Sequence, residues 1–231
     1  MPIHKYFVQE NARRSEIDEF LSQDLKRAGY SRVEMTKTPL GTRVVVYAAK
    51  PGLVIGRRGE SIRDLTQVLE QRFGVQNPQI SVATLEAPEL DAKVVASQIA
   101  MALQRGIHFR RAAYWALQRT IEAGALGVEI SIRGKLTTDR ARYEKYKAGY
   151  LPSVGEAISK LVRFAVVDTQ LKQGLFGIRV RLMPPNVSLP DKPSIREAPT
   201  EVVQPKPAVT QVAAEIDATK EVAETAHPEE T

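Results

Sequence analysis

The spacing of apolar residues predicts one helix near the N-terminus and a β-hairpin after it. The segment from Ser15 to Asp18 resembles a capping box, and Gly29 is a helix stop, so the helix is predicted to begin at Ser15 and end before Gly29. Residues 32–36 and 43–49 are rich in β-branched residues and flank Pro39 and Gly41, which favours a hairpin. The apolar positions at helical spacing are Ile17, Phe20, Leu21, Leu25 and Ala28.

The remaining pattern predicts three more helices and five more strands. A helix with Ile62, Leu65, Leu69 and Phe73 on one face is predicted to stop at Gly74. Strands are predicted at 79–85, 128–133, 140–147, 161–167 and 177–183, and helices at 91–105 and 108–123. Pro88 lies between a strand and a helix, which predicts a domain boundary there. Two domains are therefore expected, 1–87 and 88–186, followed by residues 187–231.

Charge divides the 231-residue chain into two unequal parts. Residues 1–186 hold 29 Lys and Arg against 18 Asp and Glu, whereas residues 187–231 hold 4 against 9. The second part has six prolines and no glycine or aromatic residue, so it is predicted to be a disordered acidic tail. A basic body favours a polyanionic partner such as nucleic acid, because bound phosphates release their counterions. General solubility is the alternative explanation.

Several kinds of chemistry find no support in the sequence. The chain has no cysteine, which excludes disulfides, thiol nucleophiles and cysteine-ligated zinc. His4, His108 and His227 are far apart, so no metal site is predicted, and no Walker phosphate loop is present. Apolar runs are short and the N-terminus does not resemble a secretory signal, so we expect a cytosolic protein without membrane contact. No cofactor, catalytic residue or small-molecule substrate is predicted.

The segment from Gly56 to Gly59 is the most informative motif. Its two glycines enclose Arg57 and Arg58, whereas the other glycine pairs of this spacing enclose apolar residues. Glycines let a sugar-phosphate backbone approach, and the N-terminus of the helix after them attracts phosphate. The alternative is that these four residues form an ordinary turn with no binding role. The candidate RNA-binding residues of this loop and its flank are Lys50, Gly52, Gly56, Arg57, Arg58 and Gly59.

The order of elements around this loop resembles a type II KH domain, in which a GXXG loop clamps about four nucleotides. Residues 49–56, 88–93, 109–112, 124–127, 131–136 and 173–180 are similar, in order, to the family of the third protein of the small ribosomal subunit, in its archaeal and eukaryotic form. The resemblance implies an α+β fold, a type II KH domain followed by a second α+β domain with two helices and about four strands.

The same resemblance implies a structural protein of the subunit head rather than an enzyme. Its implied partners are small-subunit ribosomal RNA, neighbouring head proteins, and messenger RNA at the channel by which it enters. Two alternatives stay open: a nucleic-acid-processing enzyme such as a nuclease or lyase, and a KH RNA-binding protein outside the ribosome.

The helix at 108–123 places a second group of candidates away from its apolar stripe. Arg111 and Arg119 each lie four residues from Trp115, a spacing that allows a cation–π contact. Such a contact would form a platform for RNA or for a neighbouring protein; the alternative is that another element of the same domain covers the Trp115 ring. The resemblance implies that, in bacterial relatives, an arginine pair at the positions of Arg110 and Arg111 belongs to a basic cluster at the messenger RNA entry. A lysine three residues after the second arginine assists that pair in those relatives, and this chain has Tyr114 at that position. A strand-opening role is therefore not predicted.

Basic residues of the second domain complete the set. They fall on its predicted strands and loop, and phosphate contact and a solvated basic surface are both compatible with them. Arg140, Arg142 and Glu144 are expected to share one strand face. Glu86, Glu89 and Asp91 are expected to cap the following helix. The candidate RNA or messenger contacts are Arg110, Arg111, Trp115, Arg119, Arg133, Lys135, Arg140 and Arg142.

Overall fold

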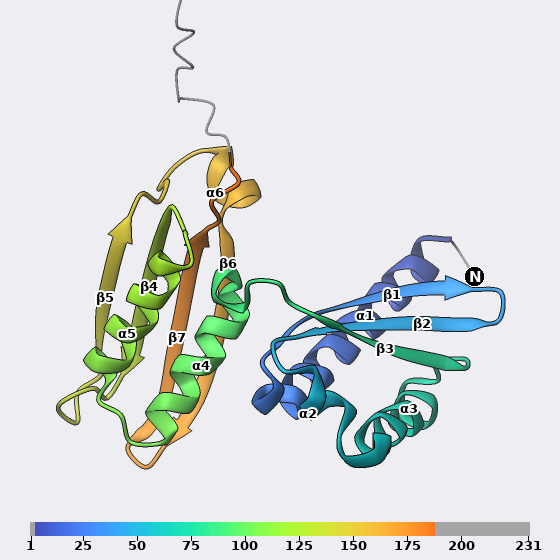
Figure 1. The fold of residues 1–231 in the computed structure, drawn as a ribbon. Helices are drawn as coiled ribbons and strands as arrows, with labels where there is room; N and C mark the ends of the chain where they lie inside the picture. Colours follow the sequence, from blue (N-terminus) through green and yellow to red (C-terminus); the bar gives the residue numbers. More distant parts are fainter. Residues whose placement is uncertain (1–2, 188–231) are drawn as a thin grey trace, which may run out of the picture. The chain divides into compact units, whose positions relative to one another are not determined.

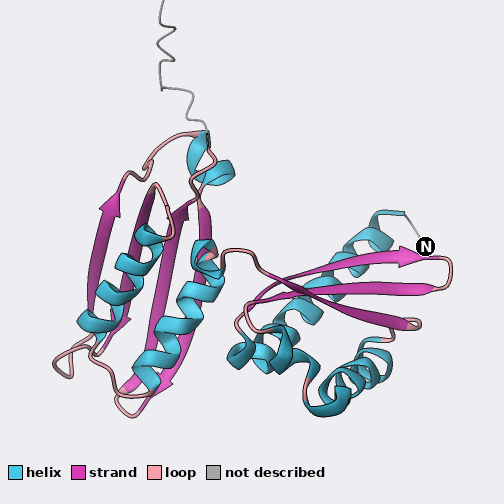
Figure 2. Cartoon of the chain, in the orientation of Figure 1, coloured by secondary structure: helices cyan, strands magenta, loops and turns pink. Residues whose placement is uncertain are grey.

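The computed structural model of the chain describes residues 3–187, which form two β-sheets with helices packed on them (Figure 1). The predicted acidic tail lies outside the described residues, apart from Val187. No helix within residues 3–187 is long and apolar enough to cross a membrane. Figure 2 shows how the helices and strands alternate along the described chain.

The first sheet has the order β1-β2-β3 and belongs to the segment predicted to be a KH domain. β1 and β2 pair antiparallel as a hairpin, and β3 pairs parallel to β2. Apolar side chains from the helices, such as Leu21 and Leu69, are buried with Val44 and Val46 of β2. The elements are α1 (Ile3–Asp24), a 3-10 turn (Leu25–Ala28), β1 (Tyr30–Thr38), β2 (Gly41–Ala48), α2 (Pro51–Ile55), a second 3-10 turn (Arg57–Gly59), α3 (Glu60–Phe73) and β3 (Pro78–Thr84).

The predicted start of the first helix is wrong. α1 begins at Ile3, so Ser15 lies inside the helix and does not cap it. Only Ile17 and Leu21 of this helix are buried. The apolar residues of its first turns, such as Ile3 and Phe7, are exposed, and the mostly polar residues 9–16 separate them from Ile17, so the predicted apolar stripe does not extend back to the start of the helix. The predicted end is confirmed, since Gly29 takes a left-handed conformation after the 3-10 turn, with φ 69°.

The second sheet is antiparallel throughout, in the order β5-β4-β7-β6. α4 and α5 pack on one of its faces, where they bury the core with Ile130, Ile178 and Leu182 of the central strands (Figure 1). The elements are a 3-10 turn (Pro88–Leu90), α4 (Ala92–Gln104), α5 (Phe109–Glu122), β4 (Gly127–Gly134), β5 (Arg142–Gly149), α6 (Glu156–Leu161), β6 (Arg163–Leu171) and β7 (Gly174–Met183).

Three details of this second part differ from the sequence prediction. The sequence does not predict α6, a helix of only six residues, none of them buried. Arg140 precedes β5 instead of lying on it, and the Glu144 side chain faces α5. Asp91 does cap α4, accepting a hydrogen bond from the Lys93 amide at 3.0 Å, but Glu89 pairs with Arg119 of α5 instead. The domain boundary at Pro88 stays a prediction.

Candidate nucleic-acid interface

The loop between α2 and α3 adopts a backbone that requires glycine at its first position. Gly56 has φ 73° and ψ −177°, a region that side-chain-bearing residues avoid. A Cβ atom on Gly56 would overlap the Ser61 side chain, with its Cβ only 2.7 Å away. Gly59 is also left-handed, with φ 77° and ψ 17°, but its Cβ position has no heavy atom within 4 Å. The loop is therefore tightly folded at Gly56 and open at Gly59.

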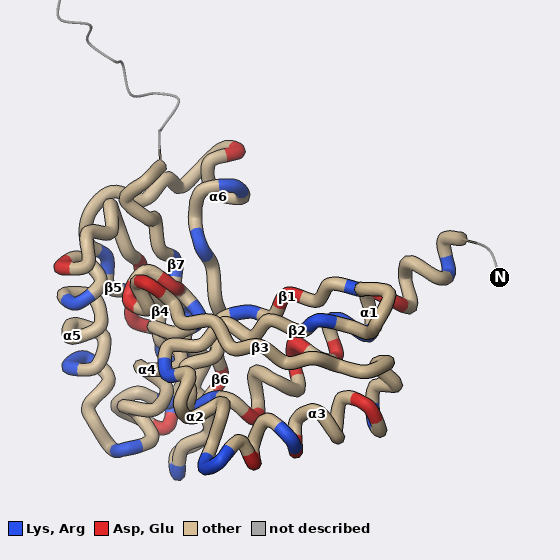
Figure 3. Tube along the Cα trace, turned by 45° about the vertical axis from the view of Figure 1, so that its right-hand side comes forward, with Lys and Arg blue, Asp and Glu red and all other residues tan. Residues whose placement is uncertain are grey.

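Both arginines of the loop project from this turn. Arg57 and Arg58 are exposed, and neither takes part in an ion pair within residues 3–187. Figure 3 shows basic residues at the turn between α2 and α3. No side chain caps the N-terminus of α3. The amide of its first residue, Glu60, donates to the Arg57 carbonyl, and the positive end of the helix dipole faces the loop, where it attracts an anion. Two unpaired guanidinium groups and a helix N-terminus thus meet at one loop.

The flank of the loop combines charge with exposed apolar surface. Lys50 and Gly52 are exposed, and Pro51 at the first position begins the short helix α2. Of the apolar residues in α2, Val54 is fully buried, whereas Leu53 is 54% and Ile55 41% exposed. Exposed aliphatic side chains beside a cationic loop offer a surface on which unstacked bases can lie.

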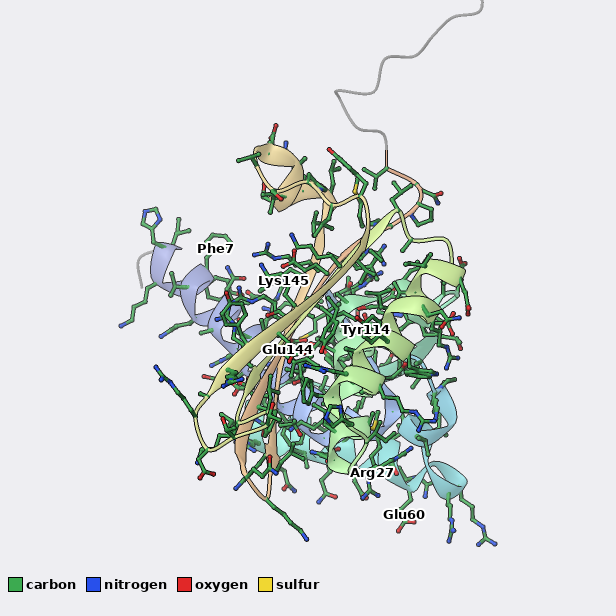
Figure 4. The ribbon with its side chains drawn as sticks, turned by 90° about the vertical axis from the view of Figure 1, so that its left-hand side faces the viewer. Phe7, Arg27, Glu60, Tyr114, Glu144 and Lys145 are labelled. Carbon is green, nitrogen blue, oxygen red and sulfur yellow. The ribbon has the colours of Figure 1, made fainter. Side chains whose placement is uncertain are left out.

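Arg110 on α5 is held by a carboxylate rather than free. Its Nε and one terminal nitrogen donate to the two Glu144 oxygens of β5 at 3.3 and 3.1 Å. This bond from Arg110, with another from Tyr146, lowers the pKa of Glu144 below its usual value. Figure 4 shows Glu144 on the side of β5 nearer Tyr114 of α5, and Lys145 on the other side. Glu144 therefore neutralises the charge of Arg110, one of the residues predicted from the sequence to contact RNA.

Trp115 lies off the buried stripe of α5, as the helical spacing predicts. The ring is 47% exposed, and the Arg119 guanidinium carbon lies 5.3 Å from the ring centroid. Arg119 Nε also donates to Glu89 at 2.6 Å. Among residues 3–187, a hollow of about 680 Å³ is lined by several predicted contacts, including Lys50, Arg111, Trp115 and Arg119. These four residues are brought together, although their roles stay predictions.

The four basic residues predicted on the second sheet lie around the connection between β4 and β5, where Arg142 pairs with Gly134, between Arg133 and Lys135. Arg133 on β4 has its guanidinium carbon 5.9 Å from the centroid of the Tyr143 ring. Lys135 follows β4, Arg140 precedes β5 and Arg142 begins β5, and all three are exposed. Sequence reasoning missed Arg179 and Arg181 of β7. Their alternation with Ile178, Val180 and Leu182 is the period-two signal that marks them as outward-facing.

A buried carboxylate lies between the basic residues of this sheet. Glu129 of β4 is 6% exposed and pairs with Lys147 at 3.1 Å and Lys145 at 3.6 Å. Burial opposes its ionisation, but the bond from Lys147 and the charges of both lysines and Arg181 outweigh that effect and lower its pKa. Within residues 3–187, no group of three His, Asp or Glu side chains is placed to hold a metal ion.

Comparison with known proteins agrees with the two-part fold. Residues 16–90 match the family described as KH domain, and residues 99–182 match the family described as ribosomal protein S3, C-terminal domain. The small ribosomal subunit protein uS3 of Methanocaldococcus jannaschii is 48% identical over 84% of this chain and 94% of its own length. The proteins of the same name from Methanococcus aeolicus and Saccharolobus solfataricus are 45% and 44% identical, each over 86% of this chain, and 95% and 86% of their own length. The chain therefore belongs to the uS3 family of small ribosomal subunit proteins.

Proposed function

We propose that this chain is a structural component of the small ribosomal subunit in the cytoplasm and binds ribosomal RNA through the loop from Gly56 to Gly59. The observation that carries the proposal is the loop itself. Its left-handed backbone, its two exposed arginines without ion pairs and the uncapped N-terminus of α3 converge on one place. This combination binds a sugar-phosphate backbone without needing a particular base sequence.

The proposed domains are residues 1–87 for the KH part and 88–186 for the second part. Support comes from the two family matches, of which one ends at residue 90 and the other begins at residue 99. The linking stretch is short, because β3 ends at Thr84 and α4 begins at Ala92. In this scheme the KH part supplies the RNA clamp, and the second part supplies further contacts.

We further propose that the second domain lies in the subunit head beside neighbouring proteins and near the channel by which messenger RNA enters. Arg111 is the stronger candidate for messenger contact, because it is exposed and has no ion pair within residues 3–187. Arg110 is bound to Glu144 and must exchange that partner for a phosphate. A role as a dedicated enzyme is not proposed, in keeping with the ribosomal names of the relatives.

The RNA clamp is tested by replacing Arg57 and Arg58 together with Asp. Both side chains are exposed, so the melting temperature should stay close to that of the wild type. Affinity for small-subunit ribosomal RNA in a filter-binding titration should fall, and the slope of log affinity against log salt should become shallower by roughly 1 to 2. Unchanged affinity and slope would reject the loop as a nucleic-acid clamp. A matched control replaces Lys5 of α1 and Arg43 of β2 with Asp, since both are exposed, have no ion pair within residues 3–187 and lie outside the loop; this variant should keep wild-type affinity and slope.

A further inference from the structure

The face of the second sheet opposite α4 and α5 carries three rows of side chains that cross all four strands. Strand pairing fixes these rows, because directly paired residues point to the same side. The first row is Lys147, Glu129, Arg181 and Phe164; the second is Lys145, Ser131, Arg179 and Val166; the third is Tyr143, Arg133, Gly177 and Asp168. We call this surface the open face.

The open face is strongly basic at its centre. Five of its positions are Lys or Arg and two are carboxylates, of which Glu129 is already neutralised by Lys145 and Lys147. Glu129 thus holds the two lysines in place on β5 and leaves excess positive charge on the surface. The Ser131 hydroxyl in the middle row is buried and has no hydrogen-bond partner within residues 3–187. Such a surface is complementary to a polyanion.

Aromatic rings stand at both edges of the open face. Tyr143 on β5 is 67% exposed, and Phe164 on β6 is 58% exposed. Each ring has an arginine beside it, with Arg133 at 5.9 Å from the Tyr143 centroid and Arg179 at 5.7 Å from the Phe164 centroid. Strands are about 4.8 Å apart, so rings on the two edge strands are separated by at least roughly 14 Å. That span accommodates several nucleotides of an extended strand.

We propose that the open face binds a single-stranded segment of RNA, with phosphates on the central cations and bases stacked on Tyr143 and Phe164. Exposed rings beside basic side chains are the combination that holds unpaired bases, because each base has a π-face and each linkage a charge. A duplex keeps its bases stacked internally and gains nothing from the rings. A polyacidic peptide such as polyglutamate matches the charge but has no ring to stack on Tyr143 and Phe164. The proposal rests on the RNA-binding function above but not on the Gly56–Gly59 loop.

The test measures binding of the full-length chain to a fluorescein-labelled, unstructured 12-nucleotide RNA by fluorescence anisotropy. Tyr143→Ala with Phe164→Ala should weaken binding by at least about tenfold, since base stacking on an aromatic ring contributes roughly 1 to 3 kcal/mol per base. Phe7→Ala is the matched control, because Phe7 is 59% exposed but belongs to α1 and not to the open face. Tyr143→Phe with Phe164→Tyr keeps both rings and should retain wild-type affinity.

The charge contribution is tested separately by Lys145→Gln with Arg179→Gln. This variant should make the salt slope shallower by roughly 0.7 for each phosphate that the chain no longer neutralises. Thermal melting of every variant confirms that the chain is folded. Unchanged affinity of the double alanine variant, or an equal loss with Phe7→Ala, would overturn the proposal. Competition by a 12-base-pair RNA duplex or by polyglutamate as strong as that by the unlabelled strand would do the same.

The two RNA-binding proposals fail in different ways in this assay. Arg57→Asp with Arg58→Asp is combined with the double alanine change of the open face. If the loop variant alone binds like the wild type while the open-face variant loses affinity, the loop proposal fails and the open face stands. If the loop variant loses affinity and the open-face change adds no further loss, the open-face proposal fails and the loop stands.

Discussion

Substitution of Gly56 by Ala should destabilise the KH part far more than the same change at Gly59, although both glycines belong to one loop. Two effects add at Gly56. Its φ of 73° with ψ of −177° is nearly restricted to glycine, and a side chain there costs roughly 1 to 3 kcal/mol. The new Cβ would also lie 2.7 Å from the Ser61 Cβ and 3.1 Å from the Ser61 amide nitrogen, an overlap that costs roughly another 1 to 3 kcal/mol.

At Gly59 only the first kind of cost applies. Its φ of 77° and ψ of 17° are left-handed helical, and no heavy atom lies within 4 Å of the Cβ position. Gly59→Ala should therefore reduce the free energy of unfolding by about 1 to 2 kcal/mol. The expected difference between the two variants is then about 2 kcal/mol, which measures the overlap with Ser61 and the more restricted backbone together.

Urea unfolding of the full-length variants, followed by circular dichroism, supplies these free energies. A third variant, Ser61→Gly in the Gly56→Ala background, removes the overlapping side chain and should recover about 1 kcal/mol or more relative to additivity. Equal destabilisation by the two alanine substitutions would refute the reasoning. A double mutant that behaves additively would show that the loop relaxes away from Ser61.

Two further predictions concern the second domain. Phe109→Ala should lower the free energy of unfolding by about 3 to 5 kcal/mol, because Phe109 is only 5% exposed. Leu117→Ala should lower it less, because Leu117 is only partly buried. Thermal melts that rank the two variants in the opposite order would contradict the packing described. Glu129 has a lowered pKa in the folded chain, so its ion pairs stabilise the fold above about pH 4.5 and this contribution is lost as the pH falls further. Glu129→Gln should flatten the acid side of the stability-against-pH curve, and an unaltered curve would show that the carboxylate is not coupled to folding.

The elements that sequence reasoning predicted are those with local signals. The β1–β2 hairpin follows from two β-branched runs about one turn, and Gly29 and Gly74 mark helix ends by their left-handed conformations. The early turns of α1 gave no such signal. They are tied instead to β1, where Lys37 pairs with Glu10 at 2.9 Å across 27 positions of the chain. This contact raises the pKa of Lys37 and lowers that of Glu10.

The candidate nucleic-acid interface likewise has one part that local sequence signals predict and another part that depends on contacts between distant residues. The loop from Gly56 to Gly59 was predictable because its glycines, arginines and following helix are contiguous. The partner of Arg110 is Glu144, 34 residues away, and no local pattern indicates that pairing. The open face depends on the order β5-β4-β7-β6, which places strands from distant parts of the sequence side by side. The composition shows that residues 1–186 are basic. Only the strand order shows which of these basic residues lie together on one face of the sheet.

The central claim, that the loop from Gly56 to Gly59 binds small-subunit ribosomal RNA, is tested most directly by site-specific crosslinking in cells. A photoreactive amino acid replaces Leu53, which is exposed beside the loop. Small subunits are then isolated by gradient sedimentation after irradiation. The chain should sediment with the small subunit and carry a covalent crosslink to its ribosomal RNA, and Arg57→Asp with Arg58→Asp should reduce that crosslink. A chain that stays at the top of the gradient, or one that sediments with the subunit without any RNA crosslink at this position, would contradict the account.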